Sequence, residues 1–372
     1  MDLFFELIQV ALGQKDRLSR TPSEEDWQSL FQMAEEQAIT SFVFPALEIL
    51  NKCGQKPPVE LLLEWIGLAE QDRSQNELMN SEAARLTALF ENEGHRTAIL
   101  KGQANARLYS NPMSRLPGDI DIWVEGGRDS VIKMLRKLKM MDDVGDLPAE
   151  GKATLTKYHV HLPANEQGVV VEVHFLPSSG NCNPRTNRRM MKWLEREIAQ
   201  TTTSTLQQFC VPSIKFALVM QLSHIQRHYL GKGIGLRQVC DYYWLLQHST
   251  PDDRNDVAGL LQSFGLSQMA GALMWILHNI FHLDEELMLC KADRDRGEWM
   301  LRDIMEIGRL ERQTMMTGKA QVRRFMASRW RSIKLLRFAF WEKVWVDWDY
   351  WIQFFRLIPL RIKYRTFSLS DV

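Results

Sequence analysis

The chain has 372 residues, enough for one large domain or for two or three smaller ones. Hydrophobic residues make up 45% and charged residues 25%, an ordinary composition for a globular protein with a sizeable core. Lysine plus arginine and aspartate plus glutamate number 46 each, so net charge points neither to nucleic acid nor to a membrane.

Cysteine usage and the first residues indicate a reducing compartment. The five cysteines are scattered and include no C-x-x-C pair, which argues against a disulfide framework and against a structural zinc site. Asp2 and Glu6 stand where a signal peptide carries positive charge. No stretch approaches the roughly 18 uncharged apolar residues of a membrane span. We therefore expect a cytoplasmic protein.

Residues 1–95 predict an N-terminal helical segment. Apolar residues recur at helical spacing over 23–50, which opens with Ser23 as a candidate N-cap. The same spacing covers 59–93 and ends at Gly94, a natural C-cap. A pair of prolines separates the two predicted helices.

Residues 96–180 change to a mixed pattern that predicts a small α/β unit. The first features in chain order are an apolar run at 98–100 and a helical piece at 103–109. A strand of period two at 119–124 and an amphipathic helix at 128–140 follow, and then a hairpin with strands at 157–162 and 169–175. This order indicates a compact mixed sheet with helices on it.

The pattern is helical again from about residue 186. The clearest predicted helices are 212–228, 236–248, 252–264 and 267–281. Residues 181–318 are therefore expected to form a C-terminal helical domain. The predicted fold class is α+β, with a small mixed-sheet core between N-terminal helices and a C-terminal helical domain.

Three carboxylates in the predicted strands carry the chemistry. Alternation puts Asp119 and Asp121 on one face of their strand. Such a pair is repulsive unless a cation lies between its members, and hard oxygen ligands favour magnesium. Glu172 is the lone acid among valines in a second strand, and it joins the pair if the two strands are neighbours.

A phosphate cradle is the remaining requirement. Lys101 and Gly102 lie where a predicted strand turns into a helix. The glycine allows close approach of the backbone, and the lysine supplies a cation next to free N–H groups.

Together these motifs resemble a known superfamily. The runs I-L-K-G at 99–102, R-x-x-G-D-I-D-I at 115–122 and V-E-V-H at 171–174 resemble the DNA polymerase beta-like nucleotidyltransferases. More narrowly, they resemble a largely uncharacterised bacterial nucleotidyltransferase-like family. The superfamily usually has Gly-Ser at the start of the helix. This chain has Gly102-Gln103, which leaves open how the triphosphate is held.

The resemblance implies residue roles. Asp119 and Asp121 would bind metal, and Glu172 would complete the triad as the base for the acceptor hydroxyl. The residues expected at the nucleotide are Lys101, Gly102, Arg115 and Gly118.

The resemblance also implies an activity: transfer of a nucleoside monophosphate, from ATP or another nucleoside triphosphate, to an acceptor, with Mg²⁺ as cofactor and pyrophosphate as product. The acceptor, a small molecule, a glycan or a protein, is left open. Nucleic acid is disfavoured, because no strand surface has the basic and aromatic pattern of a known RNA module. The alternative is a non-catalytic nucleotide- or partner-binding protein that keeps the fold.

Two i, i+4 pairs lie in the predicted C-terminal helices. His224 and His228 share a helix face but have no third metal ligand nearby in the sequence. Arg237 and Asp241 have the spacing of a helical ion pair. The functional alternative is that both pairs line the acceptor side of the site.

The C-terminal segment 319–372 is basic and aromatic. Lys and Arg number twelve within 319–365, against three Asp and Glu. Apolar side chains follow helical spacing at Phe338, Trp341, Trp345, Trp348, Ile352 and Phe355. This stripe is expected to pack onto the protein's own body. The alternative is a peripheral helix at the inner membrane face, with 319–365 contacting anionic headgroups.

Overall fold

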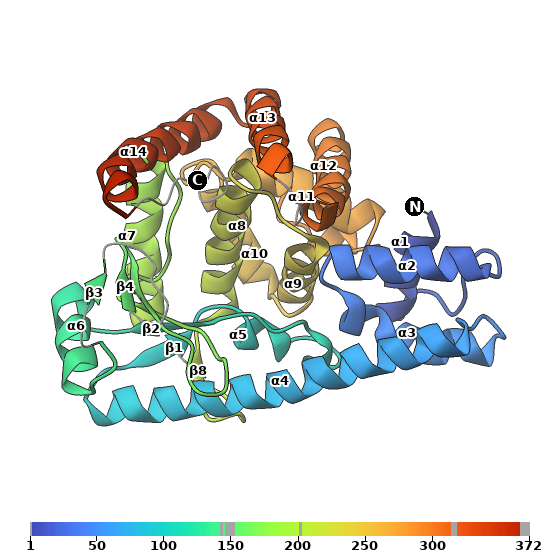
Figure 1. Ribbon diagram of the computed structural model, residues 1–372, viewed down its shortest axis with the longest axis horizontal. Helices are drawn as coiled ribbons and strands as arrows, with labels where there is room; N and C mark the ends of the chain where they lie inside the picture. The colour runs from blue at the N-terminus through green and yellow to red at the C-terminus, as the bar shows by residue number, and fades with distance from the viewer. Residues whose placement is uncertain (1, 142–143, 146–152, 201–202, 314–317, 365–372) are drawn as a thin grey trace.

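The computed structural model describes residues 2–141, 144–145, 153–200, 203–313 and 318–364. Within them a mixed sheet lies at one end of a largely helical molecule (Figure 1). The α+β class predicted from the sequence is confirmed.

The N-terminal helices are α1 (Asp2–Ala11), α2 (Glu24–Glu36), α3 (Thr40–Lys52) and α4 (Val59–Asn92). Ser23 caps α2 as predicted, and its side chain accepts a hydrogen bond from the backbone N–H of Asp26. The prediction of one helix over 23–50 is wrong at its centre. Ala38 has a φ of 57°, a left-handed conformation that ends the first helix before the second begins.

The main sheet has six strands in the order β1-β2-β6-β5-β4-β3. The strands are β1 (Thr97–Ile99), β2 (Ile120–Val124), β3 (Val144–Gly145), β4 (Ala153–Leu155), β5 (His159–Leu162) and β6 (Val171–His174). Neighbours β2 and β6 are parallel, whereas β1 and β5 flank them in antiparallel pairing. The predicted strand and hairpin are thus present, and β2 and β6 are adjacent.

Helices α5 (Gln103–Ala106) and α6 (Gly127–Lys137) accompany the sheet, with a 3-10 turn, η1, at Pro112–Ser114. A small second sheet pairs β7 (Thr203–Ser204) with β8 (Cys210–Val211). Neither β3, β4 nor this second sheet was predicted, because runs of two or three residues are too short to show a period.

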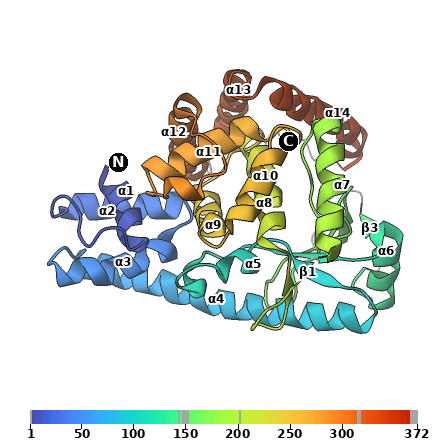
Figure 2. The same ribbon diagram turned by 180° about the vertical axis from the view of Figure 1, so that it is seen from behind.

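The rest of the described chain is helical. Its elements are α7 (Pro184–Gln200), α8 (Ile214–Leu230), α9 (Leu236–Gln247), α10 (Pro251–Leu260), α11 (Ser267–Asn279), η2 (Glu285–Leu287), α12 (Arg294–Gln313), α13 (Gly318–Leu335) and α14 (Phe340–Tyr364). Seen from both sides, α13 and α14 lie along the edge of the molecule opposite α4 (Figures 1 and 2). None of the helices in the described ranges is long and apolar enough to span a bilayer.

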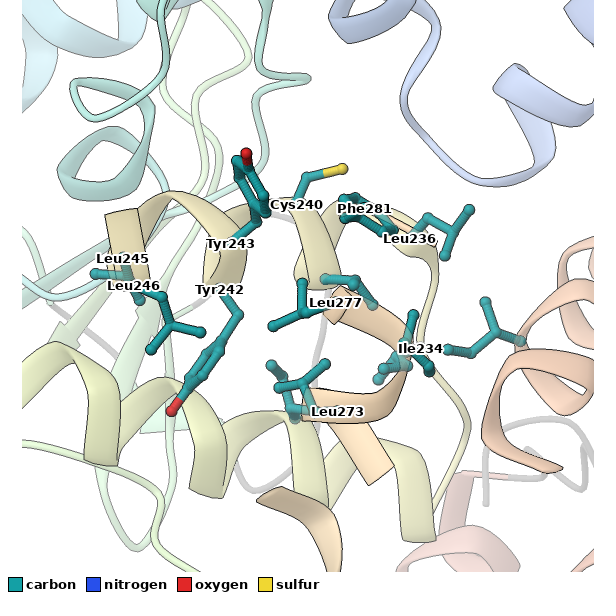
Figure 3. Packing of buried hydrophobic residues seen from close by; sticks show 14 of the residues in the cluster. Ile234, Leu236, Cys240, Tyr242, Tyr243, Leu245, Leu246, Leu273, Leu277 and Phe281 are labelled. Atoms are coloured by element: carbon teal, nitrogen blue, oxygen red, sulfur yellow. The ribbon is translucent and has the colours of Figure 1, made fainter. Parts of the chain in front are cut away.

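Two hydrophobic cores hold these elements. The larger core joins α1–α3 to the C-terminal helices, and Tyr242 and Leu246 of α9 pack there beside Leu273 and Leu277 of α11 (Figure 3). The smaller core lies between the sheet, α6 and the second half of α4. The sheet therefore has one face on the smaller core and turns its other face toward the larger core.

Candidate active site

Parallel pairing of β2 with β6 brings the three predicted carboxylates together. Asp121 stands opposite Glu172 in the register, and Asp119 directly precedes β2. Carboxylate oxygens of all three lie within 4.8 Å of one another. Ile120 and Ile122 belong to the smaller core, so alternation turns Asp121 toward the opposite face of the sheet.

Lys101 lies against these acids. Its Nζ is 2.8 Å from Oδ2 of Asp121 and 3.6 Å from Oδ1 of Asp119. Burial disfavours the charged amine, but the attraction of Asp121 and Asp119 outweighs burial and raises the pKa of Lys101. The lysine is therefore a permanent cation between two carboxylates.

The backbone at Gly102 explains how Lys101 reaches this place. The carbonyl oxygen of Asp121 accepts a hydrogen bond from the N–H of Leu100 at 2.9 Å, which fixes the end of β1 beside β2. Gly102 then turns with a φ of +63°, and a Cβ on it would lie 3.3 Å from the carbonyl oxygen of Asp119. Only glycine meets both demands without strain.

Histidines from β5 and β6 surround Glu172. Nε2 of His174 is 3.0 Å from Oδ1 of Asp121 and 3.3 Å from Oε2 of Glu172. On the neighbouring strand, His159 Nε2 and His161 Nδ1 lie 3.7 and 3.5 Å from Oε1 of Glu172. The V-E-V-H run identified from the sequence includes His174, whereas His159 was missed. The signal was present, because His159 and His161 alternate on the face that pairs with Glu172.

These contacts set the charges of the site. Burial opposes the ionised form of Glu172, yet the hydrogen bond from His174 prevails and lowers its pKa to about 2. Burial also opposes the cationic form of His174, but its hydrogen bonds to Asp121 and Glu172 raise its pKa. His159 has a pKa of about 4, lowered by burial and by its neighbour His174, and is neutral at pH 7.

Two sets of side chains share Glu172 and could hold a metal ion. Asp119, Asp121 and Glu172 offer oxygen atoms alone, the donor set that magnesium prefers. His159, Glu172 and His174 offer two nitrogens and one oxygen, a set typical of zinc and related transition metals. Exposure differs within the acidic set: Asp121 is 1% exposed, Glu172 21% and Asp119 38%. A ligand therefore reaches the site from the side of Asp119 and Glu172.

Helix α8 brings His224 and His228 toward this face of the sheet. Their rings are tilted by 40° to each other, with centroids 4.2 Å apart. Burial lowers the pKa of His224 well below its ordinary value, and the positive charge of Lys101 lowers it further. The pKa of His228 is lowered by burial and by Lys101 in the same way, so both imidazoles are neutral at pH 7.

Arg115 and Asp241 form a buried ion pair that links the sheet to α9. Nε and Nη2 of Arg115 donate to the two oxygens of Asp241 at 2.7 and 2.9 Å, and the hydroxyl of Tyr109 donates to Oδ1 at 2.7 Å. Nη1 of Arg115 donates to the carbonyl of Leu116. Contact of Arg115 with a phosphate, as the resemblance implies, would require it to leave these partners.

The predicted helical pair of Arg237 with Asp241 is wrong, because Asp241 is taken by Arg115 and Tyr109. Arg237 instead donates to the carbonyls of Leu116 and Pro117 at 3.4 Å. Its Nη1 lies 3.8 Å from the position of a Cβ on Gly118. Arg237 thereby lies alongside the loop that leads into Asp119.

The whole site is contained in a region shared with known sequences. The profile of a protein family described as uncharacterised nucleotidyltransferase matches residues 23–282. The chain belongs to this family. The matched range contains the sheet, helices α2–α4 before it and helices α7–α11 after it.

Other comparisons add little to the family assignment. No curated protein matches the chain. Among solved structures, the chain is similar to an antigenic nucleotidyltransferase-like protein from Paracoccidioides brasiliensis, at 14% identity and a TM-score of 0.34. That likeness covers 59% of this chain and 96% of the other.

Proposed function

We propose that this protein is a metal-dependent nucleotidyltransferase that moves a nucleoside monophosphate, with ATP as the first candidate donor, to an acceptor. The observation that carries the proposal is the convergence of Asp119, Asp121 and Glu172 beside Lys101 on adjacent parallel strands. In the reaction, an acceptor oxygen forms a bond to the α-phosphorus of the donor. The bond to the bridging oxygen breaks, and pyrophosphate leaves.

Asp119, Asp121 and Glu172 would hold magnesium. Bound there, magnesium would neutralise phosphate charge and stabilise the leaving pyrophosphate. Lys101, already between Asp119 and Asp121, supplies a second positive charge for the phosphates of the donor. We also propose that Gly102, Arg115 and Gly118 lie at the bound nucleotide.

Glu172 and His174 supply the proton chemistry. Glu172 is ionised at neutral pH, the state that a proton acceptor requires, and it is 21% exposed. His174 holds both Glu172 and Asp121 by hydrogen bonds and so fixes their orientation. The proton of the acceptor hydroxyl would pass to Glu172 as the new bond to phosphorus forms.

A second candidate is a nucleotide-binding protein without turnover. It is favoured by one observation, that Asp121 already has Lys101 and His174 within 3.0 Å and is thus neutralised by the protein's own cations. Such a protein would keep the fold and the affinity for nucleotide while releasing no pyrophosphate with any acceptor.

Calorimetric titration with a non-hydrolysable ATP analogue, with and without magnesium, tests the proposal. We expect magnesium-dependent binding to the wild type, loss of it in Asp119→Ala/Asp121→Ala, and retention in Asp129→Asn, a change at a 98% exposed carboxylate on α6. Binding that ignores both magnesium and the double substitution would place the nucleotide elsewhere. Absence of binding to the wild type would argue against both candidates.

A further inference from the structure

Helix α14 presents aromatic side chains to solvent along one face. Trp341, Trp348 and Phe355 are 69%, 60% and 63% exposed, and Val344, Trp351 and Ile352 are 36% to 40% exposed. These six positions recur at i, i+3, i+7, i+10, i+11 and i+14, which confines them to an arc of about 100° around the helix. We call this arc the aromatic face. Of the stripe expected to pack onto the body, Phe338 alone is buried, so that expectation is wrong for most of its members.

The opposite face of α14 holds the helix in place through apolar and polar contacts, and Val346 on it packs against the larger core. Glu342 is 8% exposed and accepts a hydrogen bond from Nδ2 of Asn183 at 2.8 Å. Lys343 is 2% exposed and bonds to Asp347, which also accepts from the hydroxyl of Ser332. A surface helix normally turns its apolar side inward. On α14 the largest apolar side chains are on the outward face instead, so Trp341, Trp348 and Phe355 contribute little to holding the fold together.

The charges beside the aromatic face are positive. Lys334, Arg337 and Arg356 are exposed. Of the three acids of α14, Glu342 and Asp347 are engaged with Asn183, Lys343 and Ser332, and Asp349 is half-buried. Trp and Phe next to exposed cations are the composition of helices that lie in the headgroup region of a bilayer.

The charge pattern also decides between a membrane and a second copy of the chain. Lys334 and Arg337 lie near the start of α14, and Arg356 lies toward its end. Pairing two aromatic faces, parallel or antiparallel, would bring cations of one copy near cations of the other. Anionic headgroups meet both ends of the helix with the opposite charge.

We infer that α14 is a peripheral membrane-binding helix whose aromatic face enters the headgroup layer of an anionic bilayer. Figures 1 and 2 place α13 and α14 on an outer edge of the molecule, where a flat surface can approach them. Because α14 packs on α8, which carries His224 and His228, membrane contact at α14 would occur one helix away from the candidate site. The inference does not depend on catalysis.

Cosedimentation of the full chain with phosphatidylcholine vesicles, with and without about one third phosphatidylglycerol, tests the inference. We expect binding to the anionic vesicles that weakens with salt. Trp341→Ala/Trp348→Ala/Phe355→Ala should reduce the partition coefficient at least about tenfold. The matched control removes three exposed apolar side chains from α4, Val59→Ala/Leu63→Ala/Ile66→Ala, and should bind like the wild type.

A second variant keeps the test decisive if the aromatic triple variant does not fold. Lys334→Gln/Arg337→Gln leaves the aromatic face intact and should weaken binding by roughly fivefold for each cation removed. Equal binding by the wild type and either the aromatic triple variant or the lysine–arginine variant would overturn the inference. So would absence of vesicle binding together with a dimer that the triple variant abolishes, because the face would then serve self-association. Cosedimentation with RNA instead of vesicles would overturn it as well.

Discussion

The candidate site and the aromatic face of α14 depart from ordinary protein architecture in opposite directions. In the site, charged groups are withdrawn from water and held by one another, as with Asp121 at 1% exposure between Lys101 and His174. On α14, tryptophans are left in water while a lysine is buried beneath them. Folding alone favours neither arrangement. Burying a charge costs desolvation energy, and an aromatic side chain left in water does not contribute the free energy that its burial would provide.

The difference teaches what each region depends on. The charges of the site are interdependent, so removing one leaves its partners buried and unpaired. The side chains of the aromatic face are independent of the fold, so removing one changes little besides the surface. Substitutions should therefore act on chemistry and stability in the first region and on binding alone in the second.

The largest expected effect is on activity, from Asp121→Asn. The substitution keeps the size of the side chain but removes one negative charge at the centre of the acidic set. We expect a loss of several kcal/mol of transition-state stabilisation, at least about 100-fold in pyrophosphate release. A magnesium-dependent pyrophosphate assay measures it, with Asp129→Asn as control. Unchanged turnover would remove Asp121 from the reaction.

The largest expected effect on stability comes from Asp241→Ala. It leaves the Arg115 guanidinium, 6% exposed, without its carboxylate, at a cost of about 3–5 kcal/mol in the free energy of unfolding. Glu77→Ala, which breaks an exposed pair with Arg73, should cost less than about 1 kcal/mol. Urea unfolding compares them. Similar losses in both variants would show that burial of the pair has no energetic consequence.

The ion pair of Arg115 with Asp241 also makes the free energy of unfolding depend on pH. Arg115 holds the pKa of Asp241 below its ordinary value, although burial acts the other way. The unfolded chain therefore takes up a proton at higher pH than the native protein does. The stabilisation is complete above the ordinary pKa of an aspartate and is lost as pH falls through the lowered native value. The unfolding free energy of Asp241→Asn should vary less over this acidic range than that of the wild type.

A smaller effect is expected from Gly102→Ala. The residue has a φ of +63°, and the added Cβ would lie 3.3 Å from the carbonyl oxygen of Asp119. Strain of about 1–2 kcal/mol should follow. Because the strain falls beside Lys101 and Asp119, nucleotide affinity should fall with it. Gly127 also has a left-handed φ, of +74°, but open space around it. Gly127→Ala is therefore the control: it should lower the melting temperature by backbone strain and leave nucleotide affinity unchanged.

The smallest effect is expected from Trp348→Ala, a large change at a 60% exposed side chain. The unfolding free energy should stay within about 0.5 kcal/mol of the wild type, and pyrophosphate release should be unchanged. A loss as large as that of a buried tryptophan would mean that the aromatic face is covered by the protein's own chain, and would remove the contrast between the two regions.

Much of the candidate site could be predicted from periodicity. Alternation over the predicted strand 119–124 placed Asp119 and Asp121 on one side, and a lone acid in a valine-rich strand identified Glu172. The adjacency of β2 and β6 did not follow from alternation, since strand order depends on contacts between residues far apart in the chain. His159 was missed for another reason: the hairpin that pairs β5 with β6 was predicted, but the alternation of His159 with His161 beside Glu172 was not used.

Long-range charge pairing was the other limit. A spacing of four residues made Arg237 the obvious partner of Asp241, but Arg115, 126 residues away in the sequence, binds it instead. The stripe on α14 shows the same limit for apolar residues. Helical spacing identified the stripe, but the spacing is identical whether the face packs inward or outward. The buried contacts of Glu342 and Lys343 determine which way the helix faces.

Helix α4 has a consequence for how the molecule unfolds. Leu61 and Trp65 near its start belong to the larger core, whereas Met79, Leu86 and Phe90 belong to the smaller one. At 34 residues the helix is about 50 Å long, and a polar middle stretch joins the two halves. If either core unfolded, the half of α4 packed in it would lose its contacts, and the packing of the other half in the remaining core would weaken. The two cores are thus thermodynamically coupled through one continuous hydrogen-bonded rod, and we expect the sheet and the helical domain to lose structure in a single cooperative step.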